Sequence, residues 1–250
     1  MSKFRNKTAS ASLESRMKDN YEHAYRMYLP KRMPVILRLD GKAFHTFTRH
    51  MNKPFDEELV SLMQVTTKYL LDNIQNAVLG YTQSDEISIL IMNYNKFDTE
   101  SWFGNNIQKM VSISAAMASA YATLNYNYSI FDENNPPFKY IHFDSRTFVI
   151  PEAEANNYFV SRQQDCQRNS VQMVAQSLYS HKELQNLSCR ELIEKIEFDG
   201  NVTKKYDDYT FQEQNGSTII KCGNPYEWQI IDHIFKSDTS IVNNLLVPFE

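Results

Sequence analysis

The sequence predicts a mixed α/β fold of the ferredoxin-like type, with helices flanking one sheet. Three observations support this prediction. An apolar run over residues 35–41 ends in Asp-Gly, which is typical of a strand entering a turn. A second apolar run over residues 78–92 is interrupted by a polar turn at 83–86, which indicates a hairpin. Segments with helical periodicity lie between these runs and a later strand, so the predicted order is strand, helix, hairpin, helix, strand.

The elements before the hairpin are predicted from periodicity and from prolines. Residues 11–28 carry apolar side chains near helical spacing, and Pro30 ends that helix. The first strand then occupies residues 35–41. Residues 42–53 mix basic and aromatic side chains. We expect a loop or a short helix there, with Phe44 in the core.

Two helices and one strand complete the predicted core. Residues 57–74 carry an amphipathic stripe that indicates a helix. A long helix is expected over about residues 102–125, where many small residues suit close packing on a sheet. The last core strand is predicted at residues 138–143. A turn at 144–146 and a further extended segment at 147–150 should follow it.

The second half of the chain predicts a helical and hairpin extension. Residues 151–180 indicate one long helix, and residues 183–197 indicate another. Asn215-Gly216 predicts a hairpin turn, because both residues tolerate positive φ. No element is assigned to residues 225–250.

Length and composition are those of a globular protein with one sizeable core. The chain has 250 residues, of which 42% are hydrophobic and 13% aromatic. We expect a palm-like core over residues 1–150, including the N-terminal helix. The extension over residues 151–250 should pack on that core as part of one continuous domain.

Composition also narrows the classes of function. No apolar run approaches membrane-spanning length and the N-terminus carries no apolar signal segment, so no membrane partner is expected. The three cysteines fit neither a metal site nor a disulfide framework, which favours free thiols and a cytoplasmic protein. The net charge of −4 argues against a general nucleic-acid binder. Basic residues outnumber acidic ones over residues 1–32, however, and such a face could bind phosphate or simply be solvated.

Asp40 and Asp85 are the candidate chemical centre. Asp40 ends the first strand and Asp85 lies in the hairpin turn, and the predicted topology makes these strands antiparallel neighbours. Two carboxylates a few ångströms apart raise each other's pKa unless a cation lies between them. Together with the Gly41 carbonyl they offer oxygen ligands that suit Mg²⁺. Either Asp alone would be interpreted as a turn residue, but their shared edge favours the metal site.

A ferredoxin-like sheet with paired carboxylates at one edge is the palm arrangement of polymerases and nucleotide cyclases, which use two metal ions. Short motifs then occur in order over about residues 15–180. They are RLDGKAFH at 38–45, GYTQSDE at 80–86, WF at 102–103, QK at 108–109, FDSR at 143–146, NYF at 157–159 and RQQDC at 162–166. With these motifs the sequence resembles the tRNA-histidine guanylyltransferase family, and most of all its guanylyltransferase-like branch from bacteria and archaea.

The resemblance implies addition of nucleotides to the 5′ end of tRNA in the 3′-to-5′ direction, with GTP and ATP as substrates and two Mg²⁺ ions. It implies that Asp40, Gly41 and Asp85 hold the metals, and that Glu86 joins Asp40 and Asp85 in the catalytic set. It implies a homotetramer, a dimer of dimers. It assigns nucleotide binding to Asp40, Gly41, Lys42, Ala43, Phe44, His45, Lys53, Asp56, Ser84, Asp85 and Lys109.

One segment departs from the family pattern. Eukaryotic members carry HINNLYN after the pair that corresponds to Asp165-Cys166, whereas residues 167–172 here read QRNSVQ. This departure favours template-dependent repair of 5′-truncated tRNA over strict guanylation of tRNA-histidine. Two other functions stay open at this point: a palm-fold nucleotide cyclase, and a non-catalytic RNA-binding module.

Overall fold

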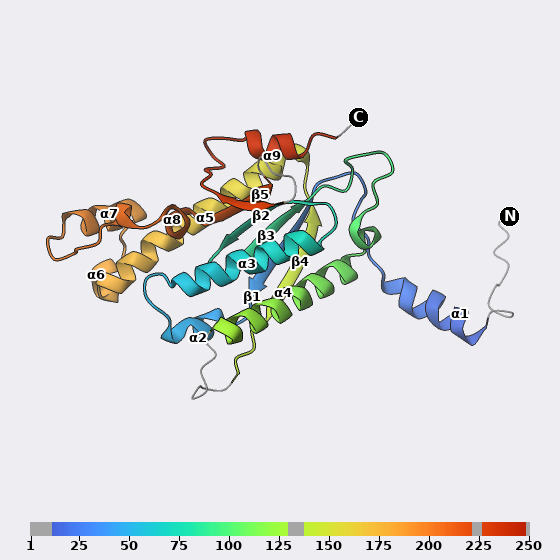
Figure 1. The fold of residues 1–250 in the computed structure, drawn as a ribbon, viewed down its shortest axis with the longest axis horizontal. Helices are drawn as coiled ribbons and strands as arrows, with labels where there is room; N and C mark the ends of the chain where they lie inside the picture. The colour runs from blue at the N-terminus through green and yellow to red at the C-terminus, as the bar shows by residue number, and fades with distance from the viewer. Residues whose placement is uncertain (1–11, 130–137, 222–226, 249–250) are drawn as a thin grey trace.

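The computed structural model in Figure 1 describes residues 12–129, 138–221 and 227–248. One antiparallel sheet runs through the centre of the molecule, with the strand order β4-β1-β3-β2-β5-β6. The first four strands in this order form the ferredoxin-like sheet, so the predicted fold class is confirmed. The strands are β1 (Val35–Gly41), β2 (Ala77–Gln83), β3 (Glu86–Ile91), β4 (Phe143–Val149), β5 (Ser217–Lys221) and β6 (Trp228–Ile231).

Helices cover both faces of the sheet, as Figure 1 shows. The long helices α3 (Glu57–Asn73) and α4 (Ile107–Ser129) pack on one face, where their apolar side chains meet those of β1 and β3. The first part of α5 (Glu152–Leu178) and the short α9 (Ser240–Leu245) pack on the other face. Because both faces are buried, the central strands read as continuous apolar runs.

The second half of α5 extends past the sheet and carries a separate small cluster. There it packs against α7 (Cys189–Phe198), through side chains that include Val174 and Ile196. Four short elements complete this end of the molecule and its link to β5. They are α6 (His181–Leu184), α7, the 3₁₀ turn η6 (Tyr206–Asp208) and α8 (Phe211–Asn215). The predicted helix at residues 183–197 is thus two helices, because Ser180 and Ser188 each begin one with a capping box.

The N-terminal helix is shorter than predicted and irregular. It runs from Leu13 to Tyr25 as α1 (Leu13–Met17), a π-helical turn η2 (Lys18–Glu22) and a 3₁₀ turn η3 (His23–Tyr25). None of its residues is buried. Figure 1 shows it projecting away from the sheet, at the opposite end from α6 and α7. The predicted residue 11 lies outside the described residues.

The prediction for residues 138–150 is partly wrong. The strand begins only at Phe143, and the predicted turn at 144–146 lies inside it, paired with β1 from Gly41↔Phe143 to Val35↔Val149. Asp-Ser-Arg was interpreted as a turn from residue type alone, but its alternating side chains serve an edge strand equally well. Residues 138–142 precede the strand and bond to α4 instead of to another strand.

The predicted hairpin turn at Asn215-Gly216 is also wrong. Asn215 ends α8 and Gly216 follows it with φ +75°, as glycine commonly does after a helix. The hairpin of this region lies one strand later, between β5 and β6, and it adds to the sheet beside β2. Within the described ranges, no helix has both the length and the hydropathy needed to cross a membrane.

Candidate active site

The end of β1 and the β2–β3 turn meet at one edge of the sheet. Asp40 pairs with Glu86 in the β1–β3 register, and the Gly41 amide donates to the Asp85 carbonyl at 3.0 Å. The turn contains only Ser84 and Asp85, and Ser84 adopts φ +49°. The predicted juxtaposition of Asp40 and Asp85 is therefore confirmed, because the antiparallel register leaves them at the same edge.

The electrostatics of this edge favour a bound cation. Burial, and to a smaller extent the neighbouring Asp40 carboxylate, raises the pKa of Asp85. Within the described part of the chain, no three His, Cys, Asp or Glu side chains gather closely enough to hold a metal by themselves. The donor set of two carboxylates and the Gly41 carbonyl fits Mg²⁺, which commonly takes its other ligands from substrate phosphates and water.

Gly41 and Phe44 fit together so tightly that position 41 requires glycine. A Cβ atom at Gly41 would lie 2.3 Å from the nearest ring atom of Phe44. Ala43 turns the chain with φ 56° into α2 (Phe44–Phe47). The Phe44 ring is buried against Phe143 at a centroid distance of 5.5 Å, which confirms its predicted place in the core. This packing fixes the backbone that follows Asp40.

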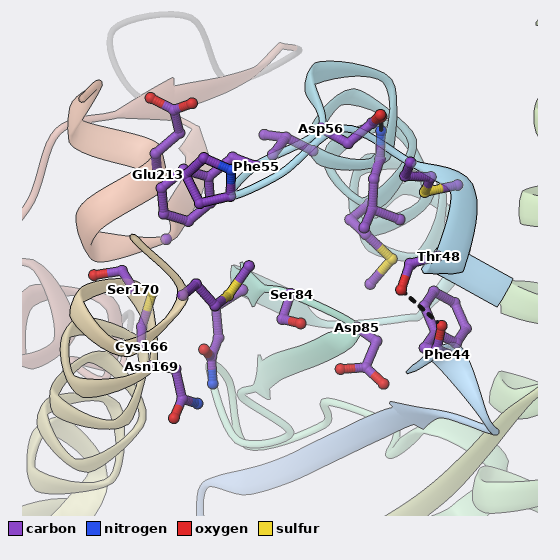
Figure 2. Close-up of a pocket in the computed structure, with 18 of the residues that line it drawn as sticks. Phe44, Thr48, Phe55, Asp56, Ser84, Asp85, Cys166, Asn169, Ser170 and Glu213 are labelled. Atoms are coloured by element: carbon purple, nitrogen blue, oxygen red, sulfur yellow. Dashed lines mark hydrogen bonds between the residues drawn. The ribbon is translucent and has the colours of Figure 1, made fainter. Parts of the chain in front are cut away.

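A cavity of about 420 Å³ opens beside this edge. Its volume falls in the usual range for small-molecule sites. Figure 2 shows Ser84 and Asp85 between Phe44 and Thr48 on one side and Cys166, Asn169 and Ser170 on the other. Eight of the predicted nucleotide-binding residues line the cavity: Gly41, Ala43, Phe44, His45, Lys53, Asp56, Ser84 and Asp85.

Asp56 lines the cavity but both of its carboxylate oxygens are already engaged. Oδ1 accepts from the Leu59 amide and Oδ2 from the Asn52 amide, each at 3.0 Å. Asp56 thereby caps α3 and closes the preceding loop. Its place in the wall is consistent with the prediction, while its contacts are those of a residue that shapes the loop.

Lys109 lies far from this edge within one chain. It sits in the first turns of α4, with its Nζ 5.9 Å from the centroid of the Phe103 ring. The acidic edge lies near Ser119, whose hydroxyl accepts from the Phe143 amide at 2.9 Å. Ten residues of helix separate Lys109 from Ser119, or about 15 Å along the axis. Asp40 and Lys42 belong to the edge but not to the cavity lining, and Lys109 belongs to neither.

Glu86 is held by two arginines. Its side chain is buried, and Oε2 accepts from Arg38 at 2.5 Å and from Arg162 at 3.3 Å. Burial raises the pKa of Glu86, although both guanidinium groups oppose the shift. Glu86 is thus next to Asp85 in sequence but in a different environment, because its charge is already compensated by protein.

The wall opposite the strands comes from α5 and α8 and was not predicted. Cys166, Asn169, Ser170 and Met173 of α5 line the cavity, together with residues of α8 and β5. Their spacing of three or four residues places them on one face of the helix. Because the sequence predicted a helix through residues 151–180, this shared face could have been found from the spacing. Nothing in the sequence pointed to Gln212 or Glu213, which also line the cavity.

Hydrogen bonds from buried and half-buried polar side chains hold this wall in place. Gln163 of α5 donates to the carbonyl of His233 at 2.7 Å and accepts from the Phe235 amide at 3.0 Å. Gln167 donates to the Asn215 side chain at 2.8 Å. Tyr81 of β2 donates to the Asn215 carbonyl at 2.8 Å. The C-terminal segments are therefore fixed to α5 and to the sheet beside the cavity.

A ferredoxin-like sheet with two carboxylates at one edge and a ligand-sized cavity beside them defines a palm-type catalytic domain. The family model described as tRNAHis guanylyltransferase matches residues 14–151. The chain therefore belongs to the tRNAHis guanylyltransferase family.

Individual relatives agree with this assignment. A bacterial tRNA(His) guanylyltransferase-like protein in complex with ATP is 41% identical with a TM-score of 0.85, and the match covers 94% of this chain and 99% of that one. A bacterial protein of the same description in complex with GTP is 38% identical with a TM-score of 0.80 over the same shares. The probable tRNA(His) guanylyltransferase of Homo sapiens is 29% identical over 141 residues, which span 55% of this chain and 45% of the human protein.

Proposed function

We propose that the protein adds nucleotides to the 5′ end of tRNA in the 3′-to-5′ direction, with nucleoside triphosphates as substrates. The single observation that carries the proposal is the pair Asp40 and Asp85 at the rim of a cavity of about 420 Å³. The complexes of two bacterial relatives with ATP and GTP support a nucleotide as the occupant of that cavity.

Asp40, the Gly41 carbonyl and Asp85 would hold Mg²⁺ at this edge. When bound, the two ions supply activation of an attacking oxygen and stabilisation of the leaving phosphate. Asp40 and Asp85 are suited to this task because no arginine of the described chain forms an ion pair with either of them. Gly41 and Phe44 keep the backbone of the site rigid, which is what precise positioning of phosphates needs.

The cavity itself has the composition expected of a nucleotide site. Its apolar lining includes Met63, Met173 and Phe55, which suit the faces of a base. Lys53, a cation, and His45, which can donate a hydrogen bond from its ring, line the cavity and would meet phosphate oxygens. Both were predicted as nucleotide-binding residues.

We infer that the nucleotide added is chosen by base pairing with the opposite strand of the acceptor stem. The segment that departs from the family pattern supports this inference. Gln167 is engaged with Asn215, and Arg168 is paired with Asp165 at 2.6 Å. Residues 167–172 therefore differ from HINNLYN in sequence, and two of them make contacts within this chain. The protein would then hold backbone and metals while the template selects the nucleotide.

A homotetramer in the cytoplasm is part of the proposal. The projecting N-terminal arm exposes Leu13, Met17, Tyr21 and Tyr25 at intervals of four residues. An apolar stripe of this kind suits burial against another copy of the chain. Cys166 and Cys189 are free thiols, which suits a reducing compartment.

The test uses a 5′-monophosphorylated tRNA that lacks its first nucleotide. The protein is incubated with this RNA, Mg²⁺, ATP and each of the four nucleoside triphosphates, and with intact tRNA-histidine in parallel. We expect extension by the nucleotide complementary to the opposing base, faster than guanylation of intact tRNA-histidine. Use of GTP alone whatever the opposing base would overturn templated repair. Formation of a cyclic nucleotide without RNA extension would overturn the transferase proposal.

A further inference from the structure

Residues 138–142 form an extended segment that is clamped along α4. Asn127 accepts from the Lys139 amide at 2.9 Å and donates to its carbonyl at 2.7 Å. Thr123, one turn earlier, accepts from the Ile141 amide at 3.0 Å and donates to its carbonyl at 3.2 Å. Ser119, a further turn earlier, accepts from the Phe143 amide at 2.9 Å. The bonding residues of α4 are four positions apart, which is a rise of about 6.0 Å, and those of the extended segment are two positions apart, which is about 6.6 Å. The two spacings match, so the bonds can repeat along the helix.

This register sends alternate side chains to opposite sides. Ile141 is buried toward α4, whereas Phe138 is 53% exposed and Tyr140 is 72% exposed. Alternation places His142 on the same side as Phe138 and Tyr140, and it is also exposed. The rings of Phe138 and Tyr140 lie 5.1 Å apart and tilted by 63°. Phe138, Tyr140 and His142 thus make one exposed row, which we call the ring stripe.

The ring stripe leads to the acidic edge. The His142 carbonyl accepts from the Lys42 amide at 2.8 Å, and Asp144 pairs with Asp40 in the β1–β4 register. The charge of Asp144 is compensated by Arg146 at 3.0 Å. Lys42 is an exposed cation whose backbone adjoins His142, while the exposed Arg146 is paired with Asp144. Since β4 is the edge strand of the sheet, no other strand lies between this row and solvent in the described chain.

We propose that the ring stripe binds unpaired RNA and guides it to the acidic edge. Exposed aromatic rings beside cations are the means by which proteins hold single strands, because every base has a face that can stack and every nucleotide carries a phosphate. A double-stranded stem offers no free base faces along its side. The stripe therefore distinguishes unpaired from paired RNA.

The unpaired strand is the 3′ strand of the acceptor end, and this part of the inference rests on the proposed function. When the 5′ strand is short, the nucleotides opposite the gap have no partner. They would lie next to the 5′ end that reaches Asp40 and Asp85. Holding them on Phe138 and Tyr140 keeps the template extended while the incoming nucleotide pairs with it.

The test is a binding measurement that requires no catalysis. Two RNA hairpins are compared by fluorescence anisotropy in EDTA: one with a 5′ strand one nucleotide short and an unpaired 3′ strand, and one with the same stem and a blunt end. We expect wild-type protein to prefer the first. The double variant Phe138→Ala, Tyr140→Ala should lose about 10-fold or more in affinity for the first hairpin and little for the second.

Matched variants separate stacking from folding. Tyr140→Phe keeps the ring and should retain the preference. Phe198→Ala removes an aromatic side chain that is 87% exposed at the end of α7, outside the ring stripe, and should change nothing. An unchanged preference in the double variant would overturn the proposal. So would a changed molecular mass of that variant in solution, because the stripe would then be an interface between copies.

The same proteins separate this inference from the proposed function. If wild-type protein extends truncated tRNA while the double variant binds both hairpins normally, only the ring stripe inference fails. If wild-type protein extends no tRNA but its preference for the unpaired hairpin depends on Phe138 and Tyr140, only the proposed function fails.

Discussion

The two sides of the cavity come from different parts of the chain and differ in charge. The strand side, formed by the end of β1 and the β2–β3 turn, presents Asp85 with Asp40 beside it. The helix side, formed by α5 and α8, presents the uncharged Cys166, Asn169 and Met173 of α5. Its acidic residue, Glu213 of α8, is held by the amide and hydroxyl of Thr210 in a capping box. The difference indicates a division of labour. Under the proposed function, backbone register would fix the reactive charges on one side, and side-chain shape on the other side would decide how well the nucleotide fits.

The largest expected effect is on the strand side. Asp40→Asn and Asp85→Asn should each lower kcat for nucleotide addition by about 10³-fold or more, because each removes a proposed ligand of the ions that would stabilise the transition state. Single-turnover extension of a truncated tRNA measures this. Asp98→Asn, an exposed loop position, is the control. Turnover within tenfold of wild type in either variant would show that the strand side does not supply the reactive charges.

The strand side could be predicted from the sequence, and the reason is physical. The apolar runs of β1 and of the β2–β3 hairpin are short and bounded by polar turns, so their pairing leaves Asp40 and Asp85 only one place to meet. The helix side could not be predicted to the same extent. The contacts of Gln163 and Gln167 join α5 to segments about 50 to 70 residues later, which no local pattern reveals.

Residues 138–146 show a second limit of local patterns. An extended chain was expected from residue 138, but its partners from 138 to 142 are side chains of α4, and the paired strand starts at Phe143. The Asp-Ser-Arg of residues 144–146 then continues the strand. A turn and a polar edge strand use the same residue types, so only the partner strand decides between them.

Two adjacent carboxylates on the strand side sharpen the comparison by their opposite effects on stability. Glu86→Gln should destabilise the protein by about 2 kcal/mol, because leaving Arg38 and Arg162 without their buried partner costs more than is gained by relieving the burial that raises the pKa of Glu86. Both arginines keep partial access to water, which limits the loss. At this chain length the melting temperature should fall by about 4–8 °C. Asp98→Asn, at the exposed loop position, is the control and should leave the melting temperature unchanged. An unchanged melting temperature in Glu86→Gln would refute the prediction.

Asp85→Asn should instead raise the melting temperature in metal-free buffer. Burial and Asp40 raise the pKa of Asp85 in the folded protein, so folding favours its protonated form. The stability of the wild type relative to the variant is then highest below the ordinary aspartate pKa near 3.8 and falls as the pH rises through the raised pKa. Melting curves in EDTA from pH 3 to pH 8 measure this, and added Mg²⁺ should stabilise the wild type more than the variant.

Changes on the helix side should be milder and of a different kind. Met173→Ala should raise KM for the nucleoside triphosphate by about 5–10-fold through lost apolar contact, with kcat within about twofold. Gln172→Ala, the exposed neighbour on α5, is the matched control. A fall in kcat as large as that of Asp85→Asn would show that α5 takes part in the chemistry and would remove the distinction between the two sides.

The smallest expected effect on activity concerns Lys109. It was predicted to contact the nucleotide, but about 15 Å of α4 separates it from the acidic edge of its own chain. If Lys109 of one copy reaches the cavity of another copy in a homotetramer, its predicted role in nucleotide binding agrees with its distance from the edge of its own chain. Lys109→Ala should in that case lower triphosphate use as the loss of a phosphate-binding cation does.

Mixing two variants decides whether Lys109 acts between copies. Lys109→Ala and Asp85→Asn proteins are each assayed alone, then unfolded together at equal concentration, refolded and assayed again. If Lys109 serves a neighbour's cavity, a site that combines an intact Asp85 with a neighbour's intact Lys109 forms in about one quarter of positions, and activity should recover to about that fraction of wild type. If Lys109 acts in its own chain, no such site forms and mixing restores nothing. Normal activity of Lys109→Ala alone would show that this lysine is a surface residue and that the strand side supplies the charges of the site without it.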